Sequence, residues 1–146
     1  MPEASPAPRA LARYVLLHAA GDHPEPEALA VAAEQAAERL RGRLADLIGL
    51  TGYTILVARA VRLARADIPA LEGVTVDTDA EGALYGVREF ALASGDSAVA
   101  AAGLSAILDH IIGLLITFIG EDLAIRLIRE AWPELAHGPV ESEGQR

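Results

Sequence analysis

One apolar stretch, residues 103–133, constrains the fold more than any other part of the chain. It reads GLSAILDHIIGLLITFIGEDLAIRLIREAWP and would be apolar on nearly every side of a helix. That pattern is typical of a buried helix, because a helix on the surface keeps one polar face. The sequence therefore predicts a long central helix that begins after an N-cap at Asp96 and ends at Trp132-Pro133.

Small residues form a stripe along this helix. The members recur at steps of three or four and include one carboxylate: Ala102, Ala106, Asp109, Gly113, Thr117, Gly120 and Ala124. Small side chains let a second helix backbone come close, and each interior Gly costs ~1 kcal/mol relative to Ala. We therefore expect neighbouring helices to pack closely along the stripe, while large residues such as Phe118 fill its flanks.

A transmembrane interpretation of this stretch is disfavoured. The uncharged run, residues 111–120, is half of the roughly 20 apolar residues that a span requires. Extending the run toward residue 98 would place Asp109 near mid-membrane, at a cost of ~2.5–3.5 kcal/mol. We therefore expect a buried core helix and do not expect a membrane as a partner.

Composition favours helices and excludes several kinds of chemistry. The chain has 146 residues, of which 52% are hydrophobic and only 4% aromatic, and alanine is abundant. It has no Cys, which excludes disulfides and thiol chemistry, and its basic residues are all Arg, which excludes Schiff-base lysines. No known cofactor motif is present, so no cofactor is expected.

Charge is negative overall but unevenly distributed. The net charge of −9 argues against nucleic acid as the main partner. Residues 39–66 hold six Arg and one Asp, for +5, whereas residues 67–109 hold eight acids and one Arg, for −7. The two blocks either neutralise each other, within one fold or across a dimer, or provide a basic face for an acidic partner.

Hydrophobic periodicity and turn signals predict four further helices, at residues 9–20, 24–49, 53–67 and 87–93. A small β-hairpin near residues 74–85 is compatible with the pattern of Val74, Val76, Leu84 and Tyr85. The predicted fold class is all-α, a bundle of four to five helices around the long C-terminal helix.

Domain organisation follows from these elements. One helical domain is expected over residues 9–135, between a disordered tail at 1–8 and a polar tail at 136–146. The first residues lack the basic and apolar regions of a secretory signal, so a cytoplasmic location is expected.

One acidic segment resembles the opening of an EF-hand calcium loop. Asp77, Asp79 and Glu81 alternate before Gly82, as that loop requires. The twelfth position, however, is Arg88 instead of the bidentate Glu that binds the ion. We favour a solvated acidic turn and predict no metal site.

Two further groups are candidates for catalysis or ligand binding. Asp109, His110 and Glu121 carry acid–base groups, but adjacent helical residues point about 100° apart and do not face each other as a dyad. A candidate pocket also lies near four residues: Thr51, Tyr53, Thr117 and Trp132.

The interface candidates combine the small stripe with charged residues. They are Arg59, Arg62, Gly113, Thr117, Gly120 and Glu121. Glu121 could pair with Arg59 or Arg62 across a helix contact, and the spacing of Asp122, Arg126 and Glu130 predicts ion pairs along one helix.

Three functions are compatible with these features. The favoured hypothesis is a non-enzymatic interaction or regulatory module that is homodimeric, since 146 residues would leave part of the central helix uncovered. The first alternative is a bundle that binds a small molecule or lipid in an apolar pocket. The second is a metal-independent enzyme that uses Asp109, His110 and Glu121, which must then converge in one cleft.

Overall fold

The computed structural model describes residues 12, 15–17, 21, 25–77 and 82–133. Over these residues the protein is an all-α bundle with one small antiparallel hairpin, which confirms the predicted fold class. The elements follow in this order: α2 (Pro26–Asp67), η1 (Pro69–Gly73), β1 (Thr75–Asp77), β2 (Ala83–Tyr85), α3 (Val87–Ser94), α4 (Ser97–Ile119) and α5 (Glu121–Ala131). Residues 12 and 15–17, from the predicted first helix, are helical, and Ala12, Val15 and Leu16 are buried.

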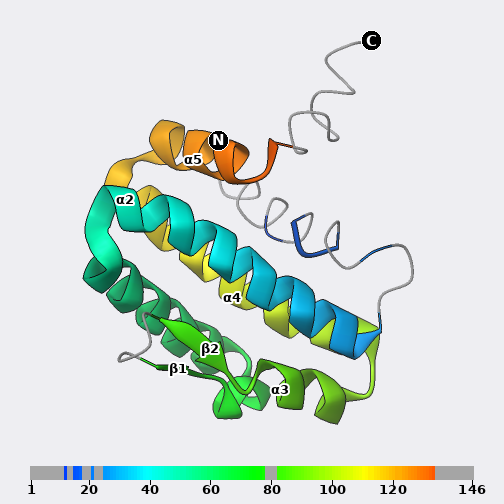
Figure 1. The fold of residues 1–146 in the computed structure, drawn as a ribbon. Coiled ribbons are helices and arrows are strands. Elements are labelled where there is room, and N and C mark those ends of the chain that lie inside the picture. Colours follow the sequence, from blue (N-terminus) through cyan, green and yellow to red (C-terminus); the bar gives the residue numbers. More distant parts are fainter. Residues whose placement is uncertain (1–11, 13–14, 18–20, 22–24, 78–81, 134–146) are drawn as a thin grey trace, which may run out of the picture.

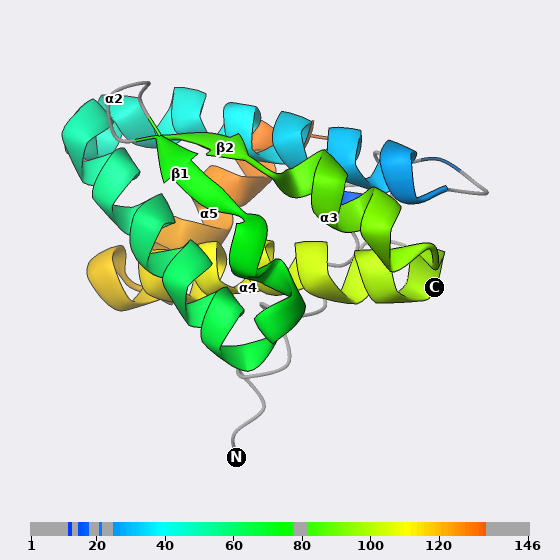
Figure 2. The ribbon, with the colours of Figure 1, turned by 90° about the horizontal axis from the view of Figure 1, so that it is seen from below.

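Helix α4 contacts α2, α3 and α5 and so ties the bundle together. The first half of α2 runs beside α4, with α5 above the pair and with the hairpin and α3 below it (Figure 1). Seen from below, the second half of α2 crosses from the side of its first half to the side of α4 (Figure 2). The core therefore lies between the two halves of α2 and one face of α4.

Periodicity identified most of this core correctly. The predicted apolar positions of both halves of α2 are buried except Leu47, as are those of α4 up to Leu115: Leu29, Ala33, Ala36, Leu40, Leu44, Leu56, Val57, Ala60, Val61, Ala64, Leu104, Ile107, Leu108, Ile111, Ile112 and Leu115. The predicted N-cap is also confirmed, because the Asp96 carboxylate accepts a hydrogen bond from the backbone N–H of Ala98 at 2.8 Å.

Gly49 breaks α2 into two helices, as the sequence predicts. Its backbone has φ 81° and ψ 161°, a region that is essentially restricted to glycine. The chain changes direction here, so α2 contributes two differently oriented faces to the same core.

Two glycines of α2 should respond in opposite ways to alanine. A Cβ atom at Gly42 or at Gly49 would meet no atom within 4 Å, but only Gly49 has a positive φ. Gly42→Ala should therefore raise the free energy of unfolding by up to ~1 kcal/mol, and Gly49→Ala should lower it by ~1–3 kcal/mol. Urea unfolding of both variants tests this, and a stabilising Gly49→Ala would rule out the bend.

A second glycine break corrects the prediction of one helix as far as Trp132. Helix α4 ends at Ile119, and Gly120 has φ 93° and ψ 156°, close to the conformation of Gly49. Helix α5 then runs back along the first half of α2, where Arg43 pairs with Glu130 at 3.8 Å. Glycine is therefore required at position 120 by the backbone conformation of the break and not by close helix packing.

The predicted close packing is wrong for the part of the small stripe that lies on α4, whereas Ala124, on α5, is buried. Ala102, Thr117 and Gly120 are exposed, and a Cβ atom at Gly113 would meet no atom within 4 Å. The close approach occurs at Gly103, on another side of α4, where a Cβ atom would overlap the ring of Phe90. The large side chains Leu104, Ile107, Leu108, Ile111 and Leu115 turn to the core, because they gain more from burial than Gly and Ala do.

Two helices, α2 and α4, are long and apolar enough to cross a membrane by length and composition alone. In the structure, 39% of the most apolar stretch of α2 and 50% of that of α4 are buried. Core helices that pack on one side pass the same test, so this finding does not by itself indicate a span.

Tyr53 is the largest fully buried side chain, and its hydroxyl donates to the carbonyl oxygen of Ala37 at 2.9 Å. Burial raises the pKa of this phenol well above its ordinary value, and the nearby Glu38 carboxylate adds to the increase, partly opposed by Arg41.

Alkaline pH should therefore destabilise the fold through Tyr53. Above about pH 10 the unfolded chain releases the phenol proton while the folded chain retains it, so the free energy of unfolding falls by up to ~1.4 kcal/mol per pH unit. Tyr53→Phe should cost ~1 kcal/mol near neutral pH and flatten this alkaline slope. Chemical unfolding at several pH values provides the test, and an equally steep slope in the variant would contradict it.

Candidate functional site

The first candidate surface is the side of α4 that the other described elements leave uncovered. We call it the open face, and it consists of Ala102, Ala106, Gly113 and Thr117, which are exposed or half-buried. The Thr117 hydroxyl donates to the carbonyl oxygen of Gly113 at 3.0 Å. The polar group is thus satisfied within the helix, and the small side chains of these four residues leave the backbone of α4 accessible to another helix.

A hydrogen-bonded contact between histidine and aspartate borders the open face. His110 Nε2 lies 2.8 Å from Asp67 Oδ2, which joins the middle of α4 to the end of α2. His110 is half-buried, whereas Asp67 is exposed. Because the two groups lie on different helices and hold the same junction, the geometry suits a structural contact at the edge of the face.

The three candidate acid–base residues do not converge. Asp109 is half-buried next to His110, but Glu121 follows eleven positions later, beyond the end of α4. A helix rises 1.5 Å per residue, so His110 lies about 13 Å before the end of α4 at Ile119, and Glu121 follows beyond the break at Gly120. The described residues therefore lack the single cleft that the enzyme hypothesis requires.

The four candidate pocket residues are also dispersed between core and surface. Tyr53 and Trp132 are buried, while Thr51 and Thr117 are exposed. The walls of three surface depressions in the described structure contain none of the four.

The candidate charged residues make fewer pairs than the sequence predicts. In the described chain, Arg59, Arg62 and Glu121 are exposed and form no ion pair with one another. The predicted pairing of Arg126 with Asp122 and Glu130 is likewise not found, because Glu130 turns to Arg43 instead. The charges of Arg59, Arg62 and Glu121 are thus available at the surface.

The calcium-like segment lies mostly outside the described residues. Asp79 and Glu81 are among residues 78–81, which the structure does not describe, and Asp77 ends β1 opposite Ala83. The described residues contain no cluster of three or more side chains that could hold a metal ion.

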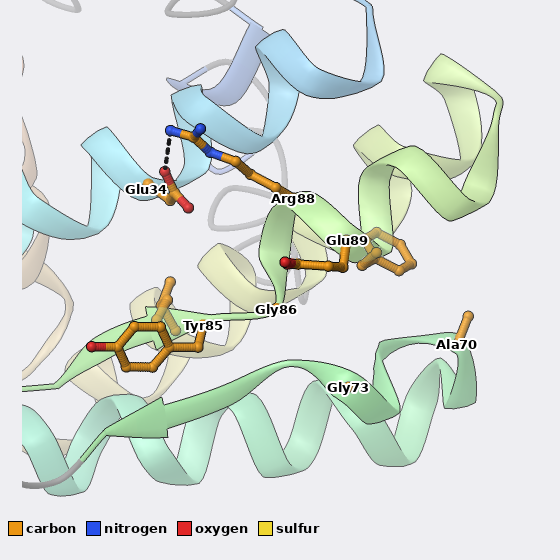
Figure 3. Close-up of a pocket in the computed structure, with 9 residues that line it drawn as sticks. Glu34, Ala70, Gly73, Tyr85, Gly86, Arg88 and Glu89 are labelled. Atoms are coloured by element: carbon orange, nitrogen blue, oxygen red, sulfur yellow. Dashed lines mark hydrogen bonds and ion pairs between the residues drawn. The ribbon is translucent and has the colours of Figure 1, made fainter.

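A groove beside the hairpin was not predicted. It has a volume of about 610 Å³ and lies between η1, β2, α3 and the first half of α2, with these residues in its wall: Glu34, Ala70, Gly73, Leu84, Tyr85, Gly86, Arg88, Glu89 and Phe90 (Figure 3). Arg88 turns away from the hairpin to pair with Glu34 at 3.3 Å. These residues are 54 positions apart, so only the fold could reveal the pair.

Both glycine breaks carry exposed large hydrophobic residues that the sequence pattern does not predict. Three of the eight exposed large hydrophobic residues of the described chain lie within two positions of Gly49 or Gly120. Leu47 is 46% exposed, Leu50 is 38% exposed and Phe118 is 62% exposed. Periodicity assigns Leu47 and Phe118 to the core, and this assignment is wrong because each helix breaks before its last turn is covered.

Comparisons with protein-family models, with curated proteins and with solved structures find no match to this chain. Function therefore has to be inferred from the surfaces described above.

Proposed function

We propose that the protein is a non-enzymatic interaction module that forms a homodimer through the open face of α4. The observation that carries the proposal is the empty space outside Gly113, next to Ala106 and Thr117. An uncovered face with small side chains lets a second copy of the helix approach to the short distances at which backbones pack. A self-complementary face of this kind suits a twofold dimer.

Charge is consistent with this proposal. Arg59 and Arg62 form no ion pair in the described chain, and neither does Glu121. A chain with a net charge of −9 that leaves arginines unpaired can use them across an interface with its own acidic surface.

Light scattering after size exclusion, on detergent-free protein, should report a dimer. Thr117→Arg, which places a charge and a long side chain on the open face, should raise the dissociation constant at least about 100-fold. Thr51→Arg is the matched control, because Thr51 is also an exposed helical threonine but lies outside the face.

Two results would overturn the proposal. The first is a wild-type protein that stays monomeric at high concentration, and the second is a Thr117→Arg variant that dimerises like Thr51→Arg. Native mass spectrometry of the same sample separates the alternative, since a monomer that retains a small molecule would indicate a ligand-binding bundle.

A further inference from the structure

We infer that the second half of α2 binds an acidic helix of a partner protein. This inference names the partner chemistry of the proposed interaction module and rests on that function. The surface, which we call the basic face, is the outer side of this half-helix and consists of three arginines and three aliphatic residues: Ile55, Ala58, Arg59, Arg62, Arg65 and Ala66.

The members of the basic face lie together because they share one side of one helix. They recur at steps of three or four between the break at Gly49 and the end of α2 at Asp67. The three arginines, Ala66 and Ile55 are exposed, Ile55 by 61%, and Ala58 is half-buried. The opposite side of the same half-helix packs into the core: Tyr53, Thr54, Leu56, Val57, Ala60, Val61 and Ala64. The basic face is therefore about 15 Å long, at 1.5 Å per residue.

The arginines of the basic face have no partner within the described chain. None of the three forms an ion pair or a side-chain hydrogen bond there. Asp67, the nearest acid along the chain, contacts His110 instead, at 2.8 Å. Glu72 also pairs with neither Arg62 nor Arg65, although it shares a depression of about 490 Å³ with them, whose wall is formed by Arg62, Arg65, Ala66, Pro69 and Glu72. The guanidinium donors are thus left for another molecule.

Helix stability does not account for the basic face. The first half of α2 carries both signs of charge, and Arg41 pairs with Glu38 there at 2.9 Å, as is typical of a solvated helix. Residues 47–66, in contrast, contain no acid. Neighbouring like charges destabilise a helix, and the helix dipole favours only Arg65, in the last turn. An anionic partner accounts for the remaining two arginines.

An acidic helix complements the basic face better than a nucleic acid or a membrane does. Carboxylates at steps of three or four on a helix would meet guanidinium groups that have the same spacing, and each carboxylate can accept two hydrogen bonds from one arginine. The small side chains of Ala58 and Ala66 let the partner helix come close. A duplex or an anionic bilayer extends beyond so short a face, and the rest of a chain with a net charge of −9 would repel it.

A different protein also matches better than a second copy of this chain. The described helices that carry acids carry arginines as well: α5, for example, has Glu121 and Asp122 in its first turn but Arg126 and Arg129 farther along. A second copy would therefore bring like charges to the basic face. The dimer proposal does not need this surface, because the open face lies on α4.

The test uses the full chain and a labelled synthetic helical peptide of alanine, leucine and glutamate, with the glutamates at steps of three or four. Fluorescence anisotropy should show saturable binding that weakens as salt is added, and a peptide with glutamine in place of glutamate should not bind. Failure of the glutamate peptide to bind would overturn the inference.

Charge is tested with two matched double variants. Arg62→Gln combined with Arg65→Gln should weaken binding at least about ten-fold. Arg126→Gln combined with Arg129→Gln is the control, because it removes the same charge from two exposed arginines at the same spacing on α5, and it should bind like wild type. Equal weakening by both would overturn the inference, because net charge alone would then explain the attraction.

The aliphatic part of the basic face is tested separately. Ile55→Ala should weaken binding at least about three-fold. Leu92→Ala is the control, because Leu92 is 60% exposed on α3 and lies outside the basic face. Equal binding by the two variants would contradict a helix seated along the whole face.

Two further outcomes assign the basic face to another occupant and also overturn the inference. In the first, the Arg62 and Arg65 double variant dissociates the dimer, which makes the face a contact between copies of this chain. In the second, the wild type binds a DNA duplex or phosphatidylserine vesicles more tightly than the peptide and loses this property in the same variant. A monomeric wild type that binds the glutamate peptide would overturn the dimer proposal alone, whereas a dimer that does not bind it would overturn this inference alone.

Discussion

Replacing Gly86 with alanine should lower the free energy of unfolding by about 2–5 kcal/mol. Gly86 joins β2 to α3 (Figure 3) with φ 85°. A Cβ atom there would overlap the carbonyl group of Gly73 and lie 3.2 Å from Val74 Cα. The expected loss combines ~1–2 kcal/mol for a left-handed alanine with ~1–3 kcal/mol for overpacking against a backbone that cannot rotate away. Urea unfolding followed by circular dichroism measures it.

Gly95→Ala is the matched control, because Gly95 ends the same helix in the same left-handed region. It has φ 64°, and a Cβ atom there would meet no atom within 4 Å. Its cost should therefore be only the ~1–2 kcal/mol of the backbone conformation. If the two variants were equally stable, η1 would not pack against the start of α3.

Trp132→Ala should cost about 3–5 kcal/mol, because it removes a large side chain from the contact between α5 and α2. Trp132 is buried, and the Arg39 guanidinium lies 5.6 Å from the centre of its ring. Hydrogen exchange should show lost protection mainly in α5, whose end Trp132 caps.

Arg39→Ala tests the cation–π contact with Trp132 separately from the burial of the indole ring. It removes a cation–π contact and the hydrogen bond to Ala131, so it should cost only about 1–2 kcal/mol. If Trp132→Ala were no more destabilising than Arg39→Ala, burial of the indole would not be what holds α5 in place.

Local patterns were sufficient for most elements of this protein but did not reveal the break at Gly120 between α4 and α5. The break at Gly49, the N-cap at Asp96, the short helix α3 and the hairpin all follow from neighbouring residues. Their physical causes act over one to four residues, through backbone conformation and local hydrogen bonds, so a single sequence contains them.

The face of α4 that points to the core could not be predicted from local patterns. A stripe of small residues and a stripe of large ones are both compatible with a helix contact, and the sequence does not state which one faces inward. Packing decides this, because burying Leu104, Ile111 and Leu115 removes more apolar area from water than burying Ala106 or Gly113. The consequence is that the small stripe becomes the open face.

The candidate surfaces likewise depend on which helices pack against one another. The exposure of Leu47, Leu50 and Phe118 follows from the breaks at Gly49 and Gly120, where the helices end before their last turns are covered. The sequence by itself thus determined most of the helices, the N-cap at Asp96 and the break at Gly49, because those arise from interactions between near neighbours. Only the tertiary structure decided which faces remain open to water, because burial is a property shared between segments that are far apart in the chain.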